Sequence, residues 1–155
     1  MVKPIPKPLL LDTVRKYVSP QTVDDSAILL VDDDLKSLEL MSETLRSAGY
    51  ETQSVQTGVR ALEVLDSKIV DAVLLDLLMP GMDGFEVIDH IRGRKDLQHL
   101  PILVMTGKNL TSEEKDLLAS QTQALFQKNA PWQKQLITEI ARVLNNRMKA
   151  RAAAK

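Results

Sequence analysis

A short apolar run that ends on a single carboxylate constrains this chain more than any other feature. Within Asp71–Gly84, DAVLLDLLMPGMDG, the run Ala72–Leu75 is too short for an independent helix and suits a strand buried on both faces. The run ends at Asp76, and a turn-rich segment follows before a helical pattern starts at Phe85. Because open α/β sheets place their binding sites at the carboxyl ends of strands, we expect Asp76 to belong to a functional site.

Apolar runs and helical patterns alternate along the chain from residue 27 to residue 144. The predicted strands are Ala27–Val31, Glu51–Val55, Ala72–Leu75, Pro101–Met105 and Ala124–Gln127. Helical patterns follow them near 35–48, 58–68, 85–92, 112–121 and 131–144. This alternation predicts an α/β fold, a flavodoxin-like (βα)5 doubly wound parallel sheet with strand order 2-1-3-4-5. In that order the first and third strands are neighbours.

Several helix starts carry side chains suited to capping. Asp34 and Asp83 precede the first and third helical patterns, and Thr111, with Glu114 behind it, opens the fourth. The spacing of Val59, Leu62, Glu63 and Leu65 predicts the second helix, which starts near Gly58 and ends before Ile69.

The regular pattern divides the chain into three parts. Residues 1–26 form a predicted N-terminal extension with a proline-rich segment, a short helix and a polar linker, for which a frayed tail is the alternative. Residues 27–146 form the domain, and residues 147–155 a basic helical tail. No acidic residue follows Glu139.

Composition narrows the class of protein. The formal net charge of −1 argues against nucleic-acid binding by bulk electrostatics. The chain has no cysteine, and no apolar run approaches the ~18 residues that would span a bilayer. The N-terminus lacks a signal-peptide cleavage pattern. We therefore expect a cytoplasmic protein with no membrane contact.

The predicted strand order brings three carboxylates together at one edge of the sheet. Asp32 and Asp33 follow the first strand, and Asp76 follows the third. At about 4 Å and an effective dielectric near 20, each pair of charges costs on the order of 4 kcal/mol. A hard divalent cation with oxygen ligands offsets this repulsion, and Mg²⁺ suits one or two carboxylates with waters and a phosphate.

Two further strand ends suit a phosphoryl group. Lys128 would supply a cation for one phosphoryl oxygen, and the Thr106 hydroxyl could donate to another. Alone, Thr106 would fit a loop cap and Lys128 a solvated lysine. Together with Asp76 and the Asp32–Asp33 pair, they end four neighbouring strands on the groups that phosphoryl chemistry at a carboxylate requires.

At these residues the chain resembles the receiver domains of two-component response regulators. The matching motifs are Leu30–Asp34, Asp76–Gly84, Met105–Gly107 and Lys128, within a resemblance that covers about residues 27–144. In style the motifs are closest to the receivers of hybrid sensor histidine kinases. The N-terminal extension is also similar to the end of a preceding receiver, which suggests a piece of a larger kinase.

The resemblance implies a phosphorelay switch. Asp76 would accept a phosphoryl group from a histidine kinase or a histidine phosphotransfer protein. Asp33, Asp76 and the backbone carbonyl of Leu78 would bind Mg²⁺ directly, and Asp32 through water. Thr106 would be the switch hydroxyl and Lys128 the phosphate-binding lysine. Such a domain is not an enzyme beyond weak self-dephosphorylation.

One position departs from the family, and other functions remain open. Receivers usually carry an aromatic residue three positions before the lysine, where this chain has Leu125 followed by Phe126. A pseudo-receiver that only docks to proteins is the alternative. An aspartyl-phosphate hydrolase would need a second aspartate just after the first, but Leu77 and Leu78 follow Asp76. A flavin-binding flavodoxin would need a phosphate loop after the first strand, where this chain has three acidic residues.

Overall fold

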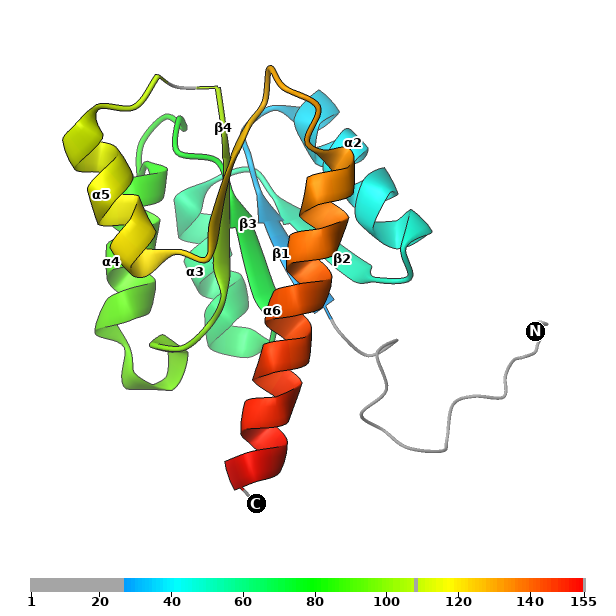
Figure 1. Cartoon of the computed structure of the whole chain (residues 1–155). Coiled ribbons are helices and arrows are strands. Elements are labelled where there is room, and N and C mark those ends of the chain that lie inside the picture. The colour runs from blue at the N-terminus through cyan, green and yellow to red at the C-terminus, as the bar shows by residue number, and fades with distance from the viewer. Residues whose placement is uncertain (1–26, 108, 155) are drawn as a thin grey trace.

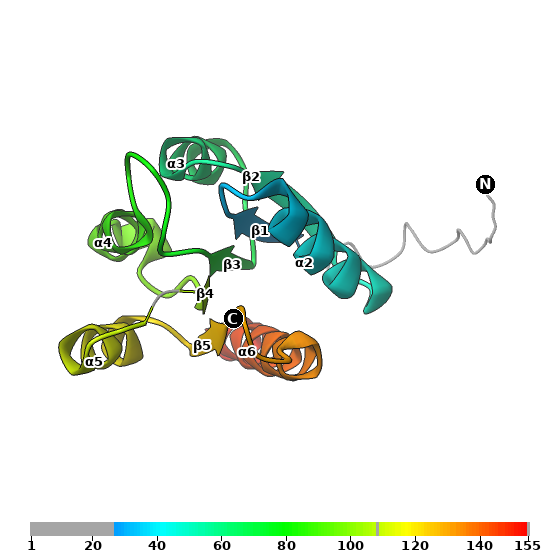
Figure 2. The same ribbon diagram turned by 90° about the horizontal axis from the view of Figure 1, so that it is seen from above.

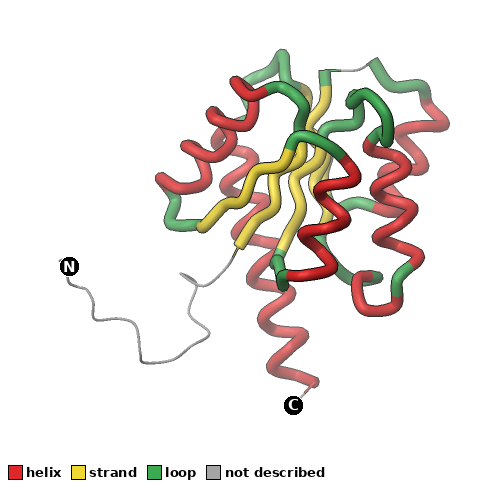
Figure 3. Tube along the Cα trace, turned by 180° about the vertical axis from the view of Figure 1, so that it is seen from behind, coloured by secondary structure: helices red, strands yellow, loops and turns green. Residues whose placement is uncertain are grey.

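A five-stranded parallel sheet forms the centre of the molecule (Figures 1 and 3). The computed structural model describes residues 27–107 and 109–154, so the predicted N-terminal extension lies outside the described residues. The strands are β1 (Ala27–Val31), β2 (Glu51–Val55), β3 (Ala72–Leu75), β4 (Ile102–Thr106) and β5 (Ala124–Gln127). The helices are α2 (Leu35–Ser47), α3 (Gly58–Ser67), α4 (Gly84–Gly93), α5 (Ser112–Gln121) and α6 (Gln133–Ala154), with a 3-10 turn η3 (Lys95–Leu97).

The strand order is β2-β1-β3-β4-β5, which confirms the predicted flavodoxin-like fold. Seen from above, α3, α4 and α5 cover one face of the sheet, and α2 and α6 cover the other (Figure 2). In the β1–β3 register Val31 lies opposite Leu75, so the next residues of both strands, Asp32 and Asp76, leave the sheet side by side. The fold alone therefore fixes the two carboxylates as neighbours.

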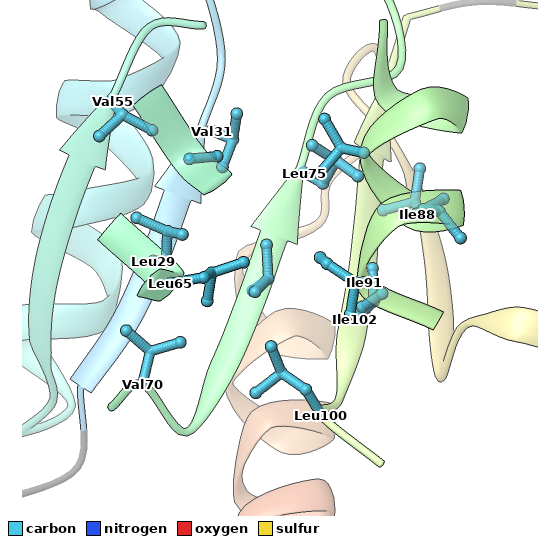
Figure 4. Packing of buried hydrophobic residues seen from close by; sticks show 14 of the residues in the cluster. Leu29, Val31, Val55, Leu65, Val70, Leu75, Ile88, Ile91, Leu100 and Ile102 are labelled. Atoms are coloured by element: carbon cyan, nitrogen blue, oxygen red, sulfur yellow. The ribbon is translucent and has the colours of Figure 1, made fainter. Parts of the chain in front are cut away.

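The strands bury both of their faces in two hydrophobic clusters. Leu29, Val31 and Leu75 pack with α3 and α4 in one cluster, which Figure 4 shows from close by. The intervening residues, such as Leu30 and Leu74, pack with α2 and α6 in the other. Successive side chains of a strand point to opposite faces of the sheet. Because both faces are covered by apolar clusters, every residue of the run is apolar, which explains the continuous apolar runs.

The predicted caps are present. The Asp34 carboxylate accepts from the Lys36 N–H (3.2 Å) at the start of α2. Asp83 and Glu86 form a capping box on α4, and Thr111 and Glu114 form one on α5. These caps satisfy main-chain donors that the first turn of a helix leaves without partners.

Helix α3 is present as predicted, but Val59, one of the residues that indicated it, is exposed over 54% of its surface. The residues of α3 that are buried include Gly58, Ala61 and Val64. A Cβ on Gly58 would lie 2.8 Å from the Val87 side chain of α4, so this glycine is where the two helices approach closely. Because successive helix residues are about 100° apart, a buried Gly58 turns Val59 toward solvent.

Helix α6 begins at Gln133 and continues to Ala154, through most of the segment expected as a basic helical tail. Its C-terminal end projects beyond the edge of the sheet (Figure 1). The division of the chain at residues 26 and 146 stays a prediction. Among the described residues, no helix combines the length and apolar character needed to cross a membrane.

Gly84, the first residue of α4, offers a test of this packing. A Cβ there would lie 2.7 Å from both the Asp76 carbonyl oxygen and the Leu77 Cα, which are backbone atoms. We expect Gly84→Ala to lower the free energy of unfolding by roughly 1–3 kcal/mol in urea titrations, as overpacking does.

Gly93, the last residue of the same helix, is the matched control. A Cβ there meets nothing within 4 Å, so Gly93→Ala should be neutral or stabilise by up to about 1 kcal/mol. Equal stability of the two variants would contradict the close approach of α4 to the backbone of Asp76 and Leu77, just after β3.

Candidate functional site

Three carboxylates meet at the carboxyl edge of the sheet. One oxygen from each of Asp32, Asp33 and Asp76 lies within 4.8 Å of the other two. Asp32 is fully buried and Asp76 is 3% exposed, whereas Asp33 is exposed. The structure thus brings together the three acidic residues that the sequence placed at the ends of β1 and β3.

Main-chain donors hold the two buried carboxylates. Asp32 Oδ1 accepts from the Asp34 N–H (2.9 Å), and Asp76 Oδ1 accepts from the Leu78 N–H (3.2 Å). The second oxygen of Asp32, Oδ2, is buried and accepts no hydrogen bond from the described residues. A buried carboxylate oxygen is costly without a partner of opposite charge, and the Lys128 ammonium lies 2.7 Å from this one.

Lys128, just after β5, is the cation of this cluster. Its Nζ lies 2.7 Å from Asp32 Oδ2 and 3.3 Å from Asp76 Oδ2. The first contact is an ion pair without hydrogen-bond geometry, while the second is also a hydrogen bond. One ammonium contacts two carboxylates of a cluster of three, which leaves up to two negative charges of the cluster uncompensated.

The surroundings shift the ionisation of both partners. Burial, together with the charge of Asp32, raises the pKa of Asp76 to about 6, although the Leu78 N–H and Lys128 oppose the shift. Burial alone would lower the pKa of Lys128, but its contact with Asp32 and the charge of Asp76 outweigh burial and raise it. Lys128 thus stays charged at neutral pH, whereas the surroundings of Asp76 disfavour the charged form of its carboxyl group.

Thr106 and Leu78 border the cluster. Thr106 is fully buried at the end of β4, and its carbonyl accepts from the Lys128 N–H (2.9 Å), so the two predicted phosphoryl-binding residues lie on paired strands. Leu78 gives its N–H to Asp76, and its side chain is 52% exposed. The role of the Leu78 carbonyl as a metal ligand stays a prediction.

Sequence reasoning missed two contacts. Asp34 was expected only as a cap, yet its main-chain N–H also holds Asp32. Gln56, after β2, donates from Nε2 to the Asp33 carbonyl (3.4 Å). A main-chain bond has no residue signature, and Gln56 follows an edge strand whose pattern is weakly apolar. Neither contact could therefore be read from residue types.

The aromatic residues near the site lie in the core. Phe126 and Trp132 are buried with α2 and α6, whereas Leu125, at the position where receivers usually carry an aromatic residue, is 36% exposed. The two neighbours on β5 point to opposite faces, as alternation along a strand requires. Phe126 therefore does not replace the missing aromatic side chain at the position of Leu125.

The donor set fits a hard divalent cation. All three side chains offer carboxylate oxygens, the ligands that Mg²⁺ prefers, and one oxygen of each lies within 4.8 Å of the other two. Burial is the main cause of the raised pKa of Asp76, and a cation would relieve the second cause, repulsion from Asp32.

Comparison with known proteins agrees with this geometry. Residues 28–141 match the family model of the response regulator receiver domain. The chain belongs to this family. Among curated relatives, the receiver resembles response regulator MprA of Mycobacterium tuberculosis, with 42% identity over 86 residues, 56% of this chain and 36% of that protein. It also resembles a probable cyclic di-GMP phosphodiesterase of Vibrio cholerae, with 35% identity over 98 residues, 63% of this chain and 22% of that protein. The matches thus span well under half of these relatives.

Solved structures show the same fold. The signal receiver domain of a signal transduction histidine kinase from Syntrophus aciditrophicus has a TM-score of 0.71 at 26% identity, over 78% of this chain and 91% of that chain. Chemotaxis response regulator CheY4 of Vibrio cholerae has a TM-score of 0.68 at 27% identity, over 76% of this chain and 98% of that chain. Receivers from kinases and from response regulators are thus both similar to this chain.

The raised pKa of Asp76 predicts how stability depends on pH. The folded chain holds a proton on Asp76 up to about pH 6, against an ordinary value of 3.8, so the contribution of Asp76 becomes unfavourable as the pH rises through this range. With a chelator present, we expect Asp76→Asn to stabilise the receiver by on the order of 2 kcal/mol at about pH 7. The gain should shrink toward about pH 4 in chemical denaturation.

Asp34→Asn serves as a control of opposite sign. A hydrogen bond from the Ser37 hydroxyl, followed by one from the Lys36 N–H, lowers the pKa of Asp34, so its charge contributes stability that is lost as the pH falls. Asp34→Asn should therefore give no gain at neutral pH. An unchanged or lower stability of Asp76→Asn at neutral pH would contradict the assigned charge balance.

Proposed function

We propose that this receiver accepts a phosphoryl group on Asp76 from a histidine kinase or a histidine phosphotransfer protein, and acts as a conformational switch in a phosphorelay. One observation carries the proposal: a buried carboxylate at a strand end lies within 4.8 Å of two others and 3.3 Å from an ammonium. Such a cluster costs stability, and phosphoryl transfer to a carboxylate uses each of its members.

Asp76 would act as the nucleophile. A carboxylate oxygen of Asp76 attacks phosphorus, the bond from phosphorus to the donor's imidazole nitrogen breaks, and an acyl phosphate forms. The imidazole leaves with the electron pair of that bond and takes a proton from solvent. The N–H of Leu78, on Asp76 Oδ1, orients the carboxylate and leaves Oδ2 toward Lys128.

Mg²⁺ would be held by Asp33, Asp76 and the Leu78 carbonyl, with Asp32 assisting through water. When bound, Mg²⁺ supplies positive charge for the phosphoryl oxygens and for the carboxylates. Lys128, now between Asp32 and Asp76, would donate to a phosphoryl oxygen, and the Thr106 hydroxyl would donate to another. The pairing of β4 with β5 keeps these two donors on one side of Asp76.

A docking pseudo-receiver is the second candidate, but the complete set of Asp33, Asp76, Thr106 and Lys128 favours phosphorylation. We further propose that the receiver is not an enzyme beyond weak self-dephosphorylation, that it works in the cytoplasm, and that it belongs to a larger hybrid kinase. The solved receiver of a histidine kinase from Syntrophus aciditrophicus supports the last idea, whereas the similarity to CheY4 does not favour it.

Incubation with acetyl phosphate and Mg²⁺, followed by intact-mass measurement, tests the proposal. We expect one phosphoryl adduct on the wild-type receiver and none on Asp76→Ala. Asp83→Asn is the matched control, because it changes a nearby carboxylate while an asparagine can still cap α4, so its adduct should persist. An adduct retained in Asp76→Ala would exclude this acceptor, and no adduct with acetyl phosphate or a phosphorylated histidine donor would favour the docking module.

A further inference from the structure

Gln56, an exposed residue between β2 and α3, donates to the turn that carries Asp33. Its Nε2 lies 3.4 Å from the main-chain carbonyl oxygen of Asp33, which can only accept. The backbone on both sides of Gln56 is fixed, because Val55 is the buried last residue of β2 and Thr57 is the N-cap of α3. The amide group of Gln56 has no part in the proposed phosphoryl transfer, so its contact with the acidic turn indicates a positional role.

The peptide group that accepts from Gln56 is bonded on its other side as well. The carbonyl of Asp33 and the N–H of Asp34 belong to the same peptide group, and that N–H donates to Asp32 Oδ1 at 2.9 Å. The peptide is therefore held by Gln56 at its oxygen and by Asp32 at its hydrogen. Because a peptide group is planar, two bonds on opposite sides fix its orientation, and each bond polarises the group in favour of the other.

The turn is also held before and after this peptide. The Asp32 N–H donates to the Val55 carbonyl (3.2 Å), so the turn begins against the end of β2. The Asp34 carboxylate caps α2, so the turn ends on the helix that follows it. The peptide between Asp33 and Asp34 is thus the part of the turn that a side chain from another element orients.

The orientation of this peptide affects two carboxylates of the cluster. Asp32 Oδ1 accepts from its N–H, so the peptide fixes one oxygen of the buried carboxylate. The same peptide restricts the ψ angle of Asp33, and with it the direction of the Asp33 carboxylate relative to the peptide. Lys128 contacts Asp32 and Asp76, whereas Asp33 is exposed, so the position of the third carboxylate depends on its main chain.

We propose that Gln56 is a positioning residue of the carboxylate cluster, which orients the peptide between Asp33 and Asp34 and so presents the carboxylates of Asp32 and Asp33 to a divalent cation. Outer partners of this kind orient the ligands of a metal site without touching the metal. The inference rests on the proposed Mg²⁺ site, because its consequence is cation affinity, but it does not require phosphoryl transfer to Asp76.

Calorimetric titration of the full chain with Mg²⁺ tests this role. Gln56→Met keeps the length of the side chain and removes the donor. We expect it to weaken Mg²⁺ binding by about threefold to tenfold, the lower end of what loss of an outer partner costs, because this bond is long and exposed. Gln56→Ala should weaken binding as well, and neither variant should change the urea midpoint of unfolding, since Gln56 is exposed.

Gln53, on β2, is the matched control. Its Oε1 accepts from Lys68 Nζ (3.0 Å) and not from the acidic turn, so Gln53→Met should leave the affinity for Mg²⁺ at the wild-type value. Unchanged Mg²⁺ affinity in both Gln56 variants, or an equal loss in Gln53→Met, would overturn the positioning role.

Amide hydrogen exchange of Asp34, measured with a chelator present, tests the orientation of the peptide itself. Loss of the Gln56 donor should speed exchange at Asp34 by about threefold or more. Exchange at Leu38, whose N–H donates to the Asp34 carbonyl in α2 (3.1 Å), should stay the same.

The two measurements separate this inference from the metal site on which it rests. If the wild type binds no Mg²⁺, the proposed metal site is wrong, and exchange at Asp34 alone decides the role of Gln56. Equal exchange at Asp34 in the wild type and in both Gln56 variants would then overturn the inference.

Discussion

Repulsion among three carboxylates at one edge of the sheet is the constraint on which the rest of this receiver depends. The β1–β3 register places Asp32 beside Asp76, and one lysine faces both. Burial, together with the charge of Asp32, raises the pKa of Asp76, so the charged form of this site is costly in the folded chain. The hydrophobic clusters on both faces of the sheet hold this site in place.

The elements around the site differ in how many side chains they bury. Strands β1 and β3 are buried on both faces, and Gly84 lets α4 pack against the backbone that carries Asp76. Helix α5 buries one side chain and is tied at its far end by Arg92.

Much of this could be predicted from the sequence, because it depends on local patterns. Apolar runs predicted the strands, and turn residues predicted where the strands end. The polar residues at those ends were Asp32, Asp76 and Lys128, which were therefore predicted as site residues. The exposure of Val59 and the carbonyl contacts of Arg92 could not be predicted, because they depend on helix phase and on main-chain atoms of distant segments. The sequence shows that Leu125 stands where receivers usually carry an aromatic residue. It does not show that the neighbouring Phe126 lies in the core.

The affinity for Mg²⁺, measured by calorimetric titration, tests the central claim that uncompensated carboxylate charge defines this site. Lys128 lies 2.7 Å from Asp32, so Lys128→Met removes a competing cation and should tighten Mg²⁺ binding by about tenfold or more. Asp33→Asn removes a charge from the same cluster and should weaken binding by a similar factor. Weaker Mg²⁺ binding in Lys128→Met, or affinity that neither substitution changes, would contradict the account.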